Sequence, residues 1–170
     1  MRVLIAAASK HEATTGIAEA IGRALSQAGI EVAVSSPAQV DSLDGYDAVV
    51  LGSAVYMGRW QPSAVGFVES HVEALRQRPV WLFSSGPIGS PDPQPKGDPE
   101  EVSELAREIG AREHHVFTGR LDRRRLGFGE RTVIAAVHAQ YGDFRNWDDI
   151  AAWGRKIARQ LARQPVSSAP

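Results

Sequence analysis

Apolar residues along the chain form two alternating patterns, which predict strands separated by helices. Short and continuously apolar runs are typical of parallel strands buried on both faces. Between these runs, apolar residues recur at helical spacing. The predicted strands are Arg2 to Ala8, Glu31 to Ser35, Ala48 to Ser53, Val80 to Ser84 and His114 to Thr118.

The helical segments have recognisable ends. The first helix begins within the polar stretch after Ala8 and stops at Gly29, and the last begins at Trp147. Two more open at Pro62 and Glu100, and a weaker candidate covers residues 130–139. Strands and helices that alternate in this way predict an α/β fold, a parallel sheet with helices on both faces. Five strands suit the order 2-1-3-4-5.

Length, charge and composition limit the possible functions. With 170 residues, of which 43% are apolar, the chain can form one core, so we expect a single domain over residues 1–164 and a disordered tail over 165–170. The net charge of −1 and scattered basic residues argue against nucleic-acid binding. No cysteine occurs, which excludes thiolate chemistry and favours a cytoplasmic protein. We expect no transmembrane segment.

The stretch from Ser9 to Thr15 joins the first strand to the first helix and is rich in donors. A helix N-terminus presents unpaired amides and a partial positive charge, which favour an anion such as phosphate. Side-chain donors come from Ser9, Lys10, His11, Thr14 and Thr15. The alternative is an ordinary helix cap by Ser9 or Thr14 with nothing bound.

Two further loops are expected at the same sheet edge, after the third and fourth strands. They offer aromatic and apolar side chains, and glycines that let the backbone approach a flat ring. A ligand with a phosphate at one end and an aromatic system at the other would suit the three loops together. Each feature alone is also compatible with an ordinary turn or edge cover. The residues concerned are Tyr56, Met57, Trp60, Ile88, Gly52, Gly58, Gly86 and Gly89.

These motifs resemble flavodoxin-domain proteins, and within them the branch of menaquinone-dependent protoporphyrinogen IX dehydrogenases. The resemblance runs from Arg2 to about Ala162. It is carried by Ser9-Lys-His with Thr14, Ile17 to Ile21, Val50 to Trp60, Phe83-Ser-Ser-Gly-Pro87, Phe117-Thr-Gly-Arg-Leu121 and Trp147 to Ile150. It implies a flavodoxin-like three-layer sandwich and a non-covalently held FMN.

The resemblance also assigns roles to the three loops. The first would hold the phosphate, and the other two would flank the isoalloxazine ring. The implied phosphate residues are Ser9, Lys10, His11, Ala13 and Thr14. One side of the ring would be flanked by Ala54, Val55, Tyr56, Met57 and Gly58. The other side would be flanked by Ser84, Ser85, Gly86, Pro87, Ile88 and Gly89.

The phosphate loop departs from the family pattern at two positions. Glu12 stands where the family usually has glycine, and Ala13 where it has serine or threonine. A carboxylate 4 Å from a phosphate costs on the order of 4 kcal/mol per charge pair at an effective dielectric near 20, unless it turns to solvent or pairs with a cation.

Two functions therefore stay open. The first is an FMN-dependent oxidoreductase or electron carrier with a redox partner such as a quinone or porphyrinogen. In it the flavin carries the electrons, and neither a catalytic side chain nor a metal is expected. Residues 123–137 could then touch a membrane surface or a porphyrin, although a basic turn followed by a core helix explains them equally well. The second is a domain that has lost its cofactor and serves as a protein-interaction module.

Overall fold

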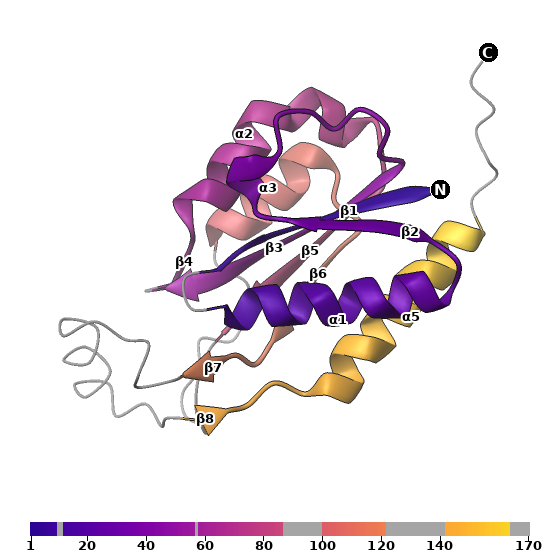
Figure 1. Ribbon diagram of the computed structural model, residues 1–170. Helices are drawn as coiled ribbons and strands as arrows, with labels where there is room; N and C mark the ends of the chain where they lie inside the picture. Colours follow the sequence, from indigo (N-terminus) through magenta and orange to yellow (C-terminus); the bar gives the residue numbers. More distant parts are fainter. Residues whose placement is uncertain (10–11, 57, 87–99, 122–141, 164–170) are drawn as a thin grey trace, which may run out of the picture.

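The computed structural model describes residues 1–9, 12–56, 58–86, 100–121 and 142–163 (Figure 1). The candidate helix over 130–139, the segment 123–137 and the tail 165–170 lie outside these residues. The strands are β1 (Arg2–Ala8), β2 (Glu31–Ser35), β3 (Ala48–Tyr56), β4 (Arg59–Trp60), β5 (Val80–Ser85), β6 (Glu113–Phe117), β7 (Arg120–Leu121) and β8 (Gly142–Asp143). The helices are α1 (Ala13–Gln27), η1 (Pro37–Gln39), α2 (Pro62–Arg76), α3 (Glu100–Ile109) and α5 (Trp147–Ala162).

The central sheet has the strand order β2-β1-β3-β5-β6, with neighbouring strands parallel. This confirms the predicted order of five parallel strands. Three short strands were not predicted. β4 pairs antiparallel with the end of β3, and β7 pairs antiparallel with β8 outside the main sheet.

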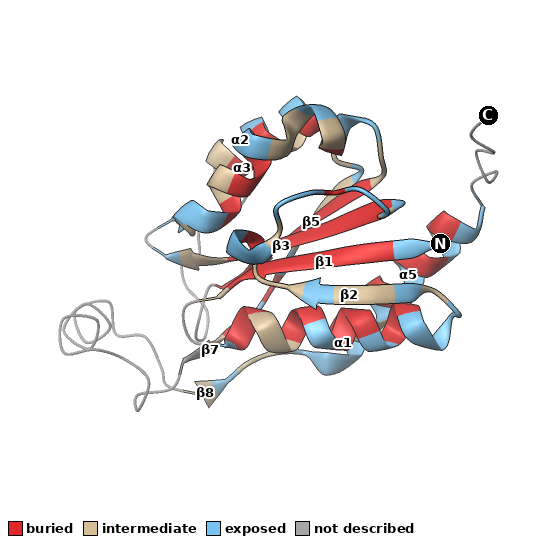
Figure 2. Cartoon of the chain, turned by 45° about the horizontal axis from the view of Figure 1, so that its top comes forward, coloured by how far each residue is buried: buried red, intermediate tan, exposed pale blue. Residues whose placement is uncertain are grey.

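Helices cover both faces of the sheet, with α1 and α5 on one side and α2 and α3 on the other (Figure 1). Successive residues of a strand point to opposite faces, so β1 contributes Val3 and Ile5 to one core and Leu4 and Ala6 to the other. Both faces of β1, β3 and β5 are therefore buried, whereas β2 at the edge is partly exposed (Figure 2). The continuously apolar runs in the sequence reflect this double burial.

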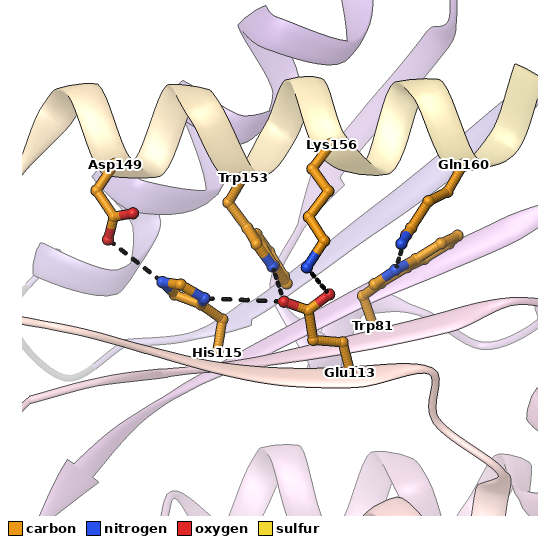
Figure 3. Close-up of polar contacts among 7 residues, drawn as sticks. All are labelled: Trp81, Glu113, His115, Asp149, Trp153, Lys156 and Gln160. Atoms are coloured by element: carbon orange, nitrogen blue, oxygen red, sulfur yellow. Dashed lines mark hydrogen bonds and ion pairs between the residues drawn. The ribbon is translucent and has the colours of Figure 1, made fainter.

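Polar contacts fasten the edge strand β6 to α5 (Figure 3). Glu113 accepts hydrogen bonds from Nζ of Lys156 at 2.7 Å and from Nε1 of Trp153 at 3.0 Å. His115, on the same side of β6, lies 3.3 Å from the carboxylate of Asp149. These contacts hold α5 over the sheet and so fix where the chain segment before this helix can lie.

No helix among the residues described here is long and apolar enough to cross a lipid bilayer.

Candidate functional site

The carboxyl ends of β1, β3 and β5 lie side by side and form one rim of the sheet. Ala8 is opposite Ser53 in the β1–β3 pair, and Ala54 is opposite Ser85 in the β3–β5 pair. The chain leaves these strands for the three stretches that the sequence singled out. Residues far apart in the sequence thus start from adjacent positions on the rim, where ligands of open α/β sheets bind.

The start of α1 carries two buried hydroxyl groups. The Oγ1 atom of Thr14 and the Oγ atom of Ser9 are buried and have no hydrogen-bond partner among the described residues, and Thr14 is fully buried. The cap position is Glu12, whose side chain caps no amide of the helix. Among the described residues, therefore, neither the Ser9 nor the Thr14 hydroxyl caps α1. Lys10 and His11, the predicted cations of this loop, lie outside the described residues.

Glu12 has a backbone conformation that is rare for residues with a side chain. Its φ is +61° and its ψ is 0°, in the left-handed region. Glycine adopts this region without a steric cost, whereas other L-residues pay about 1 kcal/mol or more. The glycine that the resemblance leads us to expect here thus has a local physical reason. Glu12 itself is exposed, and the neighbouring Ala13 is buried.

The second stretch is a hairpin rather than the loop that the sequence suggests. Ala54, Val55 and Tyr56 are the last residues of β3, and Val55 pairs with Trp60 in β4. The turn contains Gly58, whose φ of +75° explains the need for glycine. Met57 lies outside the described residues. Tyr56 is 37% exposed at the end of the strand.

The third stretch begins inside the sheet. Ser84 and Ser85 are buried residues of β5, and Gly86 follows with a φ of +115°. The amide of Gly86 donates to the carbonyl of Phe117 at 3.0 Å, which ties this stretch to the end of β6. Pro87, Ile88 and Gly89 lie outside the described residues.

A buried polar network connects the hairpin with β5 and β6. Nε1 of Trp60 donates to Oγ of Ser84 at 2.8 Å, and the same oxygen lies 2.8 Å from Nε2 of His114. Glu101 at the start of α3 accepts from the amide of Trp60 at 3.2 Å. The hairpin is therefore held against the second flank of the candidate site by specific contacts. No local pattern could predict these contacts, because they join residues 24 to 41 positions apart.

Arg145 is a further residue at the rim that sequence reasoning missed. Its side chain is only 7% exposed, and its Nη1 atom lies 3.4 Å from the carbonyl oxygen of Ala13 in the first turn of α1. The carboxylate of Asp143 accepts from the guanidinium through both oxygens. These hydrogen bonds hold the pKa of Asp143 below its ordinary value. The guanidinium also lies 4.3 Å from the ring centre of Trp147.

A pocket of about 600 Å³ opens beside the hairpin, on the side of α2 and α3. It includes the exposed ring of Tyr56, the cationic side chain of Arg59 and the carboxylate of Glu101. The same Arg59 forms an ion pair with Glu101 at 3.3 Å. The other residues that line the pocket are Trp60, Gln61, Pro62, Val65, Gly66 and Glu69.

The fold is similar to solved flavodoxin structures. A flavodoxin from the domain Archaea has a TM-score of 0.66 and 19% identity over 96% of this chain and 100% of its own. A variant flavodoxin from Pseudomonas aeruginosa has a TM-score of 0.65 and 20% identity over 95% and 99% of the two chains. Rubredoxin oxygen:oxidoreductase from Desulfovibrio gigas has a TM-score of 0.64 and 13% identity, over 95% of this chain but only 36% of its own.

Comparison with curated proteins gives no match. Comparison with protein families matches the Flavodoxin domain to residues 4–147, from β1 to the first residue of α5. This match includes every element of the rim described above. The chain therefore belongs to the flavodoxin domain family.

Proposed function

We propose that the protein binds FMN non-covalently and transfers electrons through it. The observation that carries this proposal is the pair of buried hydroxyls of Ser9 and Thr14 at the start of α1, which have no partner within the described part of the chain. A buried hydroxyl without a partner costs about 1 to 3 kcal/mol, and a phosphate would satisfy both hydroxyls together with the free amides of the first turn. The residues present thus fit the phosphate end of FMN.

The other two stretches supply the surroundings of a flat ring. In this proposal the flavin lies between the hairpin from Ala54 to Gly58 and the stretch from Ser84 to Gly89. The exposed aromatic ring of Tyr56 at the end of β3 supports the first flank, and the positive φ of Gly86 supports close backbone approach on the second. Bound FMN would supply the electron transfer, and the protein would bind and orient it.

For the redox partner we propose a quinone or porphyrinogen, as in the dehydrogenase branch that the sequence resembles. The pocket beside the hairpin supports this idea, because Tyr56 offers an aromatic surface and Arg59 a cation that is 77% exposed. A quinone ring would pack against Tyr56, whereas the carboxylates of a porphyrinogen would pair with Arg59. We also propose that residues 1–164 form one domain around this single site.

Titration of the purified protein with FMN, followed by quenching of flavin fluorescence, tests the cofactor. Wild type should bind FMN. Thr14→Val, which replaces the buried hydroxyl with a methyl group, should weaken binding about tenfold, and Thr14→Asp, which adds a negative charge, should abolish it. Ser26→Asp is the matched control, since it adds the same charge at the far end of α1. Equal affinities in all four proteins would remove the phosphate-loop assignment.

The second candidate function is a protein-interaction module without a cofactor. The carboxylate of Glu12 at the cap position favours it, because like charges repel a phosphate dianion. A colourless protein that FMN does not reconstitute would support this candidate. A yellow protein that releases FMN on denaturation would support electron transfer.

A further inference from the structure

Arg145 lies at a place where a cation is unusual. The N-terminus of a helix carries a partial positive charge, so an arginine beside the first turn is unfavourable unless negative charge compensates it. No acidic residue occupies the first turn of α1, whereas α3 and α5 have two each. The guanidinium nevertheless packs against this turn and is almost completely buried.

The surrounding residues hold this cation in one place. Asp143 binds it through two oxygens, and Trp147 lies against its face. Gly16 leaves the room that it occupies, because a Cβ atom at this position would lie 2.7 Å from Nη1 of Arg145. Three residues thus fix the guanidinium against the helix turn that carries Thr14. Such an arrangement fixes the position of a charge before any ligand arrives.

A second observation at the same turn points to a ligand. Thr14 is fully buried and its hydroxyl has no partner among the described residues, and the buried Oγ of Ser9 has none either. Unsatisfied donors and a held cation together favour an anion with several acceptor oxygens. Asp143 already neutralises part of the charge, so the cation would act on the ligand mainly through the helix turn that it positions.

We propose that Arg145 is a positioning residue that makes this site prefer a phosphomonoester to the same molecule without its phosphate. Its guanidinium fixes the first turn of α1 and adds positive potential there. This potential offsets the carboxylate of Glu12, which directly precedes Ala13. The inference rests on the proposed function and names a residue 132 positions away from the phosphate loop.

The test compares FMN with riboflavin, which lacks the phosphate, on wild type and Arg145→Gln. Wild type should bind FMN more tightly than riboflavin. Arg145→Gln should weaken FMN binding about tenfold and leave riboflavin binding unchanged, and it should make FMN binding less sensitive to salt. Ser63→Ala, at an exposed position of α2, is the control that should change neither affinity.

Gly16→Ala keeps the charge but forces the guanidinium to move, so it should also weaken FMN selectively, and more so than Ser63→Ala. This variant tests the proposal if Arg145→Gln fails to fold. Equal loss of FMN and riboflavin binding in the folded variants would overturn the proposal, and so would an unchanged FMN affinity. Equal binding of FMN and riboflavin by wild type would overturn the proposal about Arg145, although the protein would still be a flavin-binding protein. A wild type that binds neither would overturn the proposed function as well.

Discussion

The hydroxyl of Ser84 lies 2.8 Å from Nε2 of His114 and 2.8 Å from Nε1 of Trp60. An indole N–H can only donate, so Ser84 accepts from Trp60, and the same hydroxyl shares a hydrogen bond with Nε2 of His114. One serine hydroxyl thus joins β4, β5 and β6.

Ser84→Ala should destabilise the protein by about 1 to 3 kcal/mol, because it leaves the indole N–H of Trp60 without its acceptor. Trp60 is only 3% exposed, so water cannot easily replace the lost hydroxyl. Urea unfolding at neutral pH measures the change. Ser63→Ala, at an exposed position of α2, should change stability by less than about 0.5 kcal/mol. Similar losses in both variants would contradict the role given to Ser84.

Glu12→Gly should stabilise the protein by about 1 kcal/mol, because Glu12 has a φ of +61°. It should also tighten FMN binding, since it removes a carboxylate beside the proposed phosphate site. Thermal unfolding and FMN titration measure the two effects. Glu19→Gly is the matched control at an exposed position inside α1, where glycine should cost about 1 kcal/mol.

A destabilised Glu12→Gly variant would show that the backbone at this position is not strained. A stabilised variant with unchanged FMN affinity would separate the backbone effect from the charge, and would place the Glu12 carboxylate away from the ligand.

The strand order could be predicted from the sequence because strands that are buried on both faces have apolar residues at successive positions. Residues such as Leu4 and Ile5 in β1 are apolar in succession, since they face two different cores. Helix ends could also be predicted from local conformation. Proline is favoured at the first position of a helix, as Pro62 is in α2, and Gly29 has the positive φ that glycine adopts after a helix C-terminus. Local rules of this kind act within a few residues, so a single sequence reveals them.

The rest of the site depends on contacts between distant residues. The extension of β3 to Tyr56 and its pairing with β4 are stabilised by the contacts of Trp60 with Ser84 and Glu101. Arg145 lies 132 positions from Ala13, and only the packing of α5 brings it to the phosphate loop. No periodicity or local motif contains this information.

Stability should fall in acid partly because of Glu113. Burial acts to raise the pKa of Glu113, but hydrogen bonds from Lys156 and Trp153 outweigh it and hold this pKa below the ordinary value of 4.5 (Figure 3). A carboxyl with a lowered folded-state pKa stabilises the protein above its unfolded-state pKa, and this contribution disappears as the pH falls through the folded-state value.

The free energy of unfolding of wild type should therefore decrease as the pH falls below about 4.5. Glu113→Gln should be less stable than wild type at neutral pH, and the difference should shrink in this acid range. Urea unfolding at a series of pH values measures both curves. Glu104→Gln, at an exposed position of α3, is the control. A constant difference between wild type and Glu113→Gln at all pH values would show that the charge of Glu113 does not stabilise the fold.

The close approach between β3 and β5 depends on the missing side chain of Gly52. A Cβ atom at this position would overlap the ring of Phe83, which is fully buried. Gly52→Ala should therefore cost about 3 kcal/mol by overpacking. Gly66→Ala, at a helical position of α2 with no atom near the added Cβ, should instead stabilise by about 0.5 to 1 kcal/mol.

Phe83→Leu in the Gly52→Ala background separates overpacking from other causes. The smaller side chain should recover part of the lost stability if the ring is the obstacle, so the two substitutions should be less harmful together than the sum of their separate effects. Urea unfolding of the two single variants and the double variant measures this coupling. Additive losses would show that Gly52 is required for its backbone and not for the space beside Phe83.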